Sequence, residues 1–168
     1  MSNYIVNAYK TLKSIYNYID NWYFWDDVED GISAYLRYNW NCNLKVDCGS
    51  SRIVIIGKDF VIKWDYDIAA TNSIGGCEEE VKMYNYAEKA GYAHLFAKIS
   101  CIYYKGRFFY VMPRINNIGM KSANPEFYLT KNEYEWLVNH VNDLHSFNYG
   151  FIGKKLVMID YACIAIPL

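Results

Sequence analysis

The sequence predicts an α+β fold in which helices come first and an antiparallel sheet follows. Two observations predict it. Apolar residues recur every three to four positions in residues 3–19 and again in residues 78–90, which is typical of amphipathic helices. Two pairs of apolar, β-branched or aromatic runs are separated by short turns containing glycine, which is typical of hairpins. With 168 residues and 53% hydrophobic composition, the chain is long enough for one sizeable core.

Residues 1–43 are predicted to form a helical extension with an acidic-aromatic segment. After the helix over residues 3–19, residues 20–30 contain five carboxylates, four aromatic side chains and no basic residue, and Gly31 ends the segment. We expect a second short helix over residues 32–38. Aromatic side chains flanked by carboxylates suit an interface with a basic protein surface. The alternative is a helix N-terminus with favourable acidic residues and aromatics that enter the core. The candidate partner-binding residues are Trp22, Tyr23, Phe24, Trp25, Asp26, Asp27, Glu29 and Asp30.

Residues 44–168 are predicted to form one compact unit that begins with the sheet. Strands over residues 52–56 and 60–64 are joined by Gly57-Lys58-Asp59. A helix over residues 78–90 follows and stops at Gly91, which suits a left-handed helix cap. A second hairpin, over residues 97–104 and 107–112, turns at Lys105-Gly106.

The last part of the chain is predicted to contain one more helix and one more hairpin. Thr130 and Glu133 have the spacing of a capping box, so a helix should begin there and run through Val141. A turn at residues 151–153 should then join short strands at residues 148–149 and 156–159.

Composition and charge argue against a nucleic-acid-binding, membrane-spanning, disulfide-rich or zinc-binding protein. A net charge of -1 gives no global field that would attract nucleic acid. No apolar run reaches the length of a membrane span, and the N-terminus lacks the pattern of a signal peptide. We therefore expect a cytoplasmic protein without direct nucleic-acid or membrane partners. The five cysteines have no C-x-x-C pair, so neither a disulfide framework nor a zinc cage is expected.

Three oxygen-bearing side chains near the C-terminus have a suggestive order. Asp143-Leu-His-Ser-Phe-Asn148 reads D-L-x-x-x-N, and Asp160 follows on the far side of the predicted hairpin. An Asp can accept a proton from an attacking hydroxyl, and Asn and Asp supply the hard oxygen ligands that Mg²⁺ prefers. Turn chemistry is the alternative for Asn148 and Asp160, because both residue types favour tight bends.

This order resembles the catalytic loop of protein kinases, and other motifs support the resemblance. Gly49-Ser50-Ser51-Arg52 looks like the phosphate loop of kinase-like proteins carried by tailed bacteriophages. Val61-Ile-Lys63 is similar to the strand whose Lys contacts the α- and β-phosphates, and Glu80 lies in a helix like the one whose Glu pairs with that Lys. Tyr110-Val-Met-Pro113 looks like the strand that leads into the hinge. The resemblance implies a kinase-like small lobe with a truncated large lobe, over about residues 44–162.

The resemblance assigns roles and leaves alternatives open. It implies nucleotide binding by Gly49, Ser50, Ser51, Lys63 and Glu80, a catalytic base at Asp143, and metal binding by Asn148 and Asp160. Lys63 could equally be a solvated strand residue, and Glu80 one of an exposed run of three glutamates.

The departures from the family pattern concern catalysis. The phosphate loop has one glycine instead of three, Val141-Asn142 replaces His-Arg, and Tyr161-Ala162 replaces Phe-Gly. An alternative register places Asp143 at the end of the preceding helix, with the catalytic loop deleted. Leu168 follows soon after Asp160, so no peptide-binding platform is expected.

Two functions follow as expectations. The first is a non-catalytic, kinase-fold phage protein that binds and inhibits a host protein with a basic surface, with the replicative sliding clamp as first candidate and no cofactor. The second is a phosphotransferase that uses Mg-ATP to act on a small molecule or on itself. A homodimer stays an open alternative.

Overall fold

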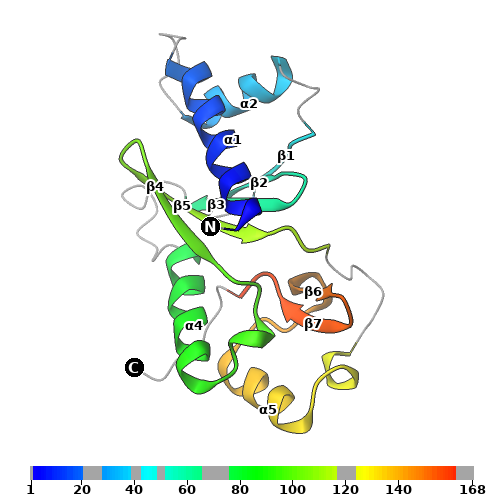
Figure 1. Ribbon diagram of the computed structural model, residues 1–168. Coiled ribbons are helices and arrows are strands. Elements are labelled where there is room, and N and C mark those ends of the chain that lie inside the picture. The colour runs from blue at the N-terminus through cyan, green and yellow to red at the C-terminus, as the bar shows by residue number, and fades with distance from the viewer. Residues whose placement is uncertain are drawn as a thin grey trace. The chain divides into compact units, whose positions relative to one another are not determined.

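The computed structural model describes residues 2–20, 28–38, 43–48, 52–65, 76–116 and 124–161 (Figure 1). The chain divides into two compact units. The first unit contains Met1–Trp64 and Ser100–Arg114, and the second contains Asp65–Ile99 and Ile115–Leu168. Each unit is described by itself below.

A five-stranded antiparallel sheet forms the centre of the first unit. Its strands are β1 (Lys45–Cys48), β2 (Arg52–Ile56), β3 (Phe60–Asp65), β4 (Ser100–Tyr104) and β5 (Arg107–Pro113), in the order β1-β2-β3-β5-β4. Both predicted hairpins of the α+β fold are therefore confirmed. β4 begins at Ser100 instead of residue 97, because the N–H of Ala97 donates to the carbonyl of Met158 at 2.8 Å in the second unit.

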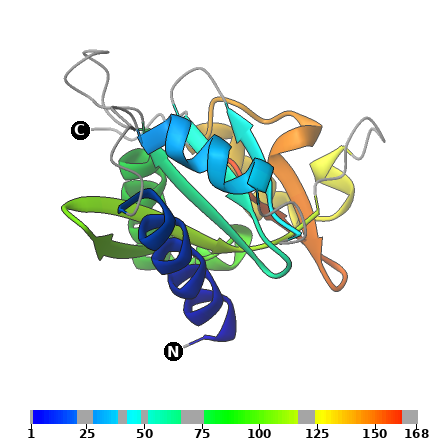
Figure 2. The same ribbon diagram turned by 90° about the horizontal axis from the view of Figure 1, so that it is seen from above.

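Helix α1 (Asn3–Asp20) packs on one face of this sheet (Figures 1 and 2). Its buried side chains, Ala8, Leu12, Ile15 and Tyr16, recur at the spacing that predicted the helix. The Tyr16 ring makes edge-to-face contacts with Phe109 of β5, at 6.0 Å between centroids, and with Tyr104 of β4, at 5.4 Å. The aromatic contacts fix which face of the sheet α1 covers.

Helix α2 spans Val28–Tyr38, so the predicted start at residue 32 was wrong. The helix runs through Gly31, which the sequence predicted to be the end of the acidic-aromatic segment. A glycine inside a helix costs only about 1 kcal/mol, and the burial of Ile32 and Ala34 offsets that cost. The Tyr18 and Tyr35 rings, 5.5 Å apart, join α2 to α1.

The described residues of the second unit form two longer helices, three short 3₁₀ turns and a hairpin. The helices are α4 (Gly76–Ala90) and α5 (Lys131–His140), and the strands are β6 (Tyr149–Ile152) and β7 (Lys155–Met158). The 3₁₀ turns are η2 (Ala93–Leu95), η3 (Pro125–Phe127) and η4 (Ser146–Asn148). α4 ends as predicted at Gly91, which has φ +84°. α5 begins as predicted at the capping box of Thr130 and Glu133.

The turn of the last hairpin differs from the prediction. Phe151 pairs with Leu156 and Ile152 with Lys155, so the turn lies at Gly153-Lys154. Gly153 has φ +63°, a conformation that glycine adopts without strain. The predicted turn at residues 151–153 was therefore placed too early.

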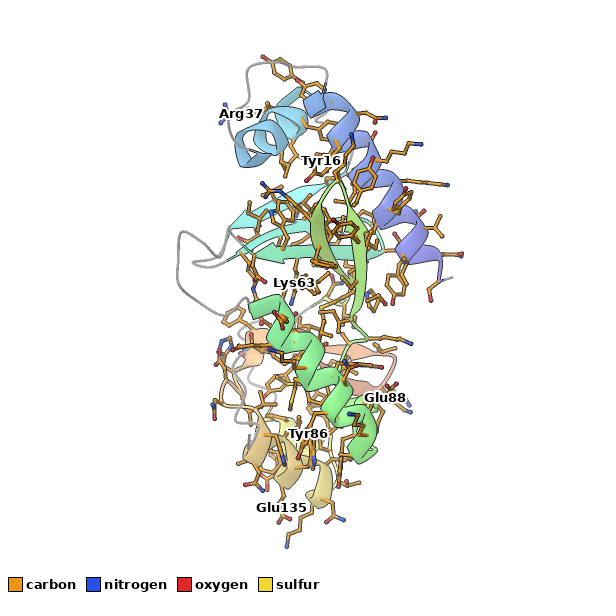
Figure 3. The ribbon with its side chains drawn as sticks, turned by 90° about the vertical axis from the view of Figure 1, so that its left-hand side faces the viewer. Tyr16, Arg37, Lys63, Tyr86, Glu88 and Glu135 are labelled. Atoms are coloured by element: carbon orange, nitrogen blue, oxygen red, sulfur yellow. The ribbon has the colours of Figure 1, made fainter. Side chains whose placement is uncertain are left out.

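A column of stacked rings joins α5 to the segment after α4 within the second unit. The Trp136 ring stacks on Tyr92 at 4.7 Å and on His140 at 4.4 Å. Tyr86 of α4 reaches the same column and stacks on Trp136 at 6.1 Å (Figure 3). These ring contacts link α4, the segment after it and α5.

Within the described residues, no helix has both the length and the apolar character needed to cross a membrane.

Candidate functional site

Three buried side chains carry an amide or a formal charge in the described part of the chain, and all three are predicted site residues. Lys63, Glu80 and Asn148 have exposed fractions of 5%, 0% and 6%. Removing such groups from water costs free energy unless partners compensate them. Their burial therefore indicates that each serves a specific purpose.

Lys63 lies in the first unit, on β3. It is paired with Tyr110 of β5 and stands between Ile62 and Trp64. Trp64 contacts Phe109, which in turn contacts Tyr16 of α1, so Lys63 projects from the opposite face of the sheet (Figure 3). Lys63 is thus not a solvated strand residue, because its side chain is buried.

Glu80 lies in the second unit, on the buried face of α4. Glu78, two residues earlier, is exposed and pairs with Lys82 at 3.0 Å. The run of three glutamates is therefore not a uniform solvated surface. Glu80 Oε1 accepts a hydrogen bond of 3.4 Å from the main-chain N–H of Tyr161.

Asp143 lies in a loop, which excludes the register that placed it at a helix end. α5 stops at His140, and Val141 already has the extended backbone angles φ -123° and ψ 118°. The Asp143 carboxylate is 46% exposed and lies 3.4 Å from Nε2 of His145. A carboxylate in this position is accessible from solvent.

Asn148 connects this loop to the end of the hairpin. Its Nδ2 donates to the main-chain carbonyl of Asp143 at 2.9 Å. Its main-chain carbonyl accepts from the N–H of Ile159 at 2.8 Å, and its own N–H donates to the carbonyl of His145 at 2.9 Å. Asn148 therefore lies across the hairpin from Ile159, and half-buried Asp160 is the next residue along.

The structure brings four of the predicted residues together along one path of hydrogen bonds in the second unit. Glu80 accepts a hydrogen bond from the N–H of Tyr161, the residue after Asp160. The N–H of Ile159, the residue before Asp160, donates to the carbonyl of Asn148. The side chain of Asn148 in turn donates to the carbonyl of Asp143. Three bonds thus fix the main chain around the candidate base and around both candidate metal ligands.

Tyr161 is a residue whose role sequence reasoning missed. Its hydroxyl donates to the carbonyl of Ala97 at 2.8 Å, and its ring contacts Phe96 at 4.9 Å. Burial raises the pKa of Tyr161 well above its ordinary value, and the neighbouring carboxylates of Glu80 and Asp160 and the hydroxyl of Tyr84 add to this effect. Tyr161 therefore stays neutral and anchors the segment that carries Asp160. The sequence showed it only as a departure from Phe-Gly.

Tyr149 is a second buried neighbour of the loop. Its hydroxyl has no hydrogen-bond partner in the described part of the chain. Burial raises its pKa, with further contributions from Tyr134 and from the Asp143 carboxylate. The phenol of Tyr149 therefore remains neutral.

The remaining predicted residues fall where the structure gives no placement. Gly49, Ser50, Ser51 and residues 22–27 lie outside the described residues. Glu29 and Asp30 belong to α2, and their side chains are not described.

Asn148 and Asp160 carry oxygen atoms of the type that a hard divalent cation prefers. Since Nδ2 of Asn148 is committed to Asp143, the amide oxygen is the atom left for a cation, and Asp160 supplies a carboxylate. The described residues contain no group of three or more His, Cys, Asp or Glu side chains placed to hold a metal ion. A cation here would therefore need additional oxygen ligands from a bound phosphate, as is usual for Mg²⁺ at nucleotide sites.

Comparisons with known proteins assign no family: no family model matches the chain, and no curated protein matches it.

Proposed function

We propose that this chain is a kinase-fold protein that binds Mg-ATP and transfers a phosphoryl group to a small molecule or to itself. The observation that carries the proposal is the burial of Lys63, Glu80 and Asn148, which are the polar residues that phosphoryl transfer of the kinase type requires. Burial of charged and amide groups costs free energy, and a ligand that interacts with them would account for keeping them at these positions.

The order of the elements supports the kinase-like assignment. α4 follows β3 and precedes β4, and Lys63 stands on β3 with Glu80 on α4. β5 lies between β3 and β4 in the sheet. In the kinase pattern, the phosphate-contacting Lys lies on the third strand and its Glu partner on the helix that follows this strand. Lys63 and Glu80 lie on the corresponding elements.

Each residue has a distinct task in the proposed reaction. Mg²⁺ would neutralise charge on the phosphates, as it does in other phosphoryl transfer sites. Asn148 and Asp160 would hold it through the amide oxygen and the carboxylate, and Lys63 would place a positive charge against the phosphates.

Asp143 is the proposed base. It would orient the substrate hydroxyl and accept its proton as the hydroxyl oxygen bonds to the γ-phosphorus, while the bond from that phosphorus to the bridging oxygen breaks and ADP leaves. The hydrogen bond from Asn148 fixes its main chain, and His145 lies beside its carboxylate. This position is accessible to a small substrate or to a side chain of the same protein.

Binding and transfer are tested separately. Saturating Mg-ATP, at about 100 times Kd, should stabilise the fold by about 2.7 kcal/mol in a thermal unfolding experiment. Lys63→Met and Asp160→Asn should abolish this shift, and the exposed control Lys154→Met should keep it. Asp143→Asn should keep the shift and lose transfer of labelled γ-phosphate to the chain or to added small-molecule acceptors. A wild-type chain without any shift in the presence of Mg-ATP would contradict the proposal.

A second function, partner binding, is favoured by an exposed aromatic pair in the first unit. Tyr103 on β4 and Phe108 on β5 are 64% and 58% exposed, and their rings lie 4.9 Å apart. Exposed aromatic residues of this kind are enriched at protein interfaces. We therefore also propose that the chain binds a host protein in the cytoplasm, as expected of a phage inhibitor.

The basic surface of the partner remains a proposal based on the sequence of residues 22–30. The sliding clamp remains its first candidate because the size and composition of the chain resemble those of small phage inhibitors of the clamp, whose DNA channel is basic. A pull-down from the lysate of a low-GC Gram-positive bacterium tests it. The double variant Tyr103→Ser with Phe108→Ser should lose the partner, whereas Phe127→Ser, another exposed aromatic residue, should retain it. Recovery of no replication protein by the wild-type chain would exclude the clamp.

A further inference from the structure

A pocket of about 420 Å³ lies in the first unit, between α1 and the turn that joins β2 to β3. This volume falls within the range of about 300–1,000 Å³ that is usual for ligand pockets. Its polar lining consists of Asn7, Lys10, Thr11, Lys58 and Asp59. None of these residues belongs to the site proposed above.

The lining is rich in hydrogen-bond donors and carries an excess of positive charge. Lys10 and Lys58 supply two ammonium groups, and Thr11 supplies a hydroxyl. Asp59 is the one acidic residue of the lining, and its Oδ2 already accepts a 2.8 Å hydrogen bond from Nδ2 of Asn7. Neither lysine forms an ion pair with a carboxylate in the described part of the chain. The pocket therefore favours an anion, and two lysines match the double charge of a phosphate monoester.

Part of the lining is apolar. Leu44 and Phe60 complete it. Phe60 is buried, and its ring packs so closely on Gly57 that a Cβ at residue 57 would overlap it. These two side chains could contact the organic part of a ligand whose phosphate is bound by the lysines.

The wall that carries Lys58 is held in place before any ligand binds. The N–H of Gly57 donates to the carbonyl of Phe60 at 2.9 Å, and the N–H of Arg114 donates to the carbonyl of Asp59 at 3.0 Å. The Arg114 guanidinium donates to the carbonyl of Gly57 at 2.9 Å. With the bond between Asn7 and Asp59, these contacts fix the turn to β5 and to α1. A fixed wall lowers the entropic cost of binding.

We propose that this pocket binds a small phosphate monoester, with its phosphate on Lys10 and Lys58 and its organic part on Leu44 and Phe60. The pocket is separate from the proposed Mg-ATP site, so the two proposals can fail independently. Lys13 provides a matched control, because it is an exposed lysine of the same helix that does not line the pocket.

The experiment titrates the full chain with phenyl phosphate, inorganic phosphate and phenol, and follows backbone amide shifts by NMR. Phenyl phosphate should bind saturably, at least about tenfold more tightly than either fragment. The largest shifts should occur at Lys10, Thr11 and Lys58. The double variant Lys10→Gln with Lys58→Gln should weaken binding by at least about tenfold, whereas Lys13→Gln and Lys63→Met should change it less than about twofold.

Three results would overturn the proposal. The first is the absence of saturation by phenyl phosphate. The second is equal weakening by Lys13→Gln, which would indicate a non-specific charge effect. The third is loss of binding in Lys63→Met with retention in the double variant, which would assign the phosphate to the proposed ATP site.

Discussion

The side-chain amide of Asn148 donates a 2.9 Å hydrogen bond to the main-chain carbonyl of Asp143. This bond makes the position of the candidate base depend on the candidate metal ligand. It also orients Asn148, because the nitrogen of the amide is committed and the oxygen is the atom left for a cation. One residue can thus organise both the loop and the cation site.

Replacement of Asn148 should destabilise the fold. Asn148→Ala leaves the Asp143 carbonyl without its side-chain donor and should lower the free energy of unfolding by about 1–3 kcal/mol. Asn148→Asp keeps the shape but cannot donate when ionised, so it should cost a similar amount. Urea denaturation measures both changes, with exposed Asn142→Ala as the control. Equal stability of the Asn142 and Asn148 variants would show that the bond contributes nothing.

Tyr161→Phe tests the anchor of the segment that carries Asp160. The substitution removes the donor to the Ala97 carbonyl and leaves that buried acceptor without its hydroxyl partner. We expect a loss of about 1–3 kcal/mol in the free energy of unfolding. Tyr103→Phe, at an exposed position, should change stability by less than about 0.5 kcal/mol. The anchor would be rejected if the two variants unfolded at the same urea concentration.

The acid dependence of stability should involve Glu133. Hydrogen bonds from Thr130, followed by that from His94, lower the pKa of Glu133 from 4.5 to about 2. Because the folded-state pKa is depressed, the stabilisation is complete above pH 4.5 and is lost as the pH falls through about 2. Glu133→Gln should remove this contribution. The difference in unfolding free energy between wild type and variant should therefore shrink between these two pH values.

The control for this titration is Glu88→Gln, which replaces an exposed carboxylate on α4 (Figure 3). Both variants are compared with wild type over the same pH range. A pH-independent difference for Glu133→Gln would mean that the capping box and the contact with His94, at 2.7 Å, do not favour the charged form.

Local patterns in the sequence were sufficient for most elements of the fold. The spacing of Ala8, Leu12 and Ile15 predicted α1, and the pair Thr130 and Glu133 predicted the start of α5, because both signals act within a few residues. β1 was not predicted as a strand, since its four residues are defined by pairing with β2. The start of α2 depends on packing that the sequence does not display.

The sequence predicted the residue types of the candidate site and their order along the chain, but not the hydrogen bonds between them. Lys63, Glu80 and Asn148 could be named because their residue types match a known order along the chain. The bond from Tyr161 to Glu80 joins residues 81 positions apart, and that to Ala97 spans 64 positions. No local pattern encodes such contacts. The loop position of Asp143 follows from the end of α5 at His140 and the extended backbone of Val141, which helical periodicity did not reveal.

Gly150 provides a test of packing next to the site, because it follows Tyr149 on β6. A Cβ added there would overlap the side chain of Ile115 and would lie 2.7 Å from the main-chain oxygen of Asn116. Main chain moves less readily than a flexible side chain, so Gly150→Ala should cost about 1–3 kcal/mol of stability. Gly153→Ala should cost about 1–2 kcal/mol for a different reason, because φ is +63° and nothing lies within 4 Å of the new methyl group. A second substitution that shortens the Ile115 side chain separates the two causes. Ile115→Ala should recover part of the stability lost in Gly150→Ala and none of the stability lost in Gly153→Ala. If Ile115→Ala gave no rescue in the Gly150 variant, the contact with the Ile115 side chain would not be the source of the loss.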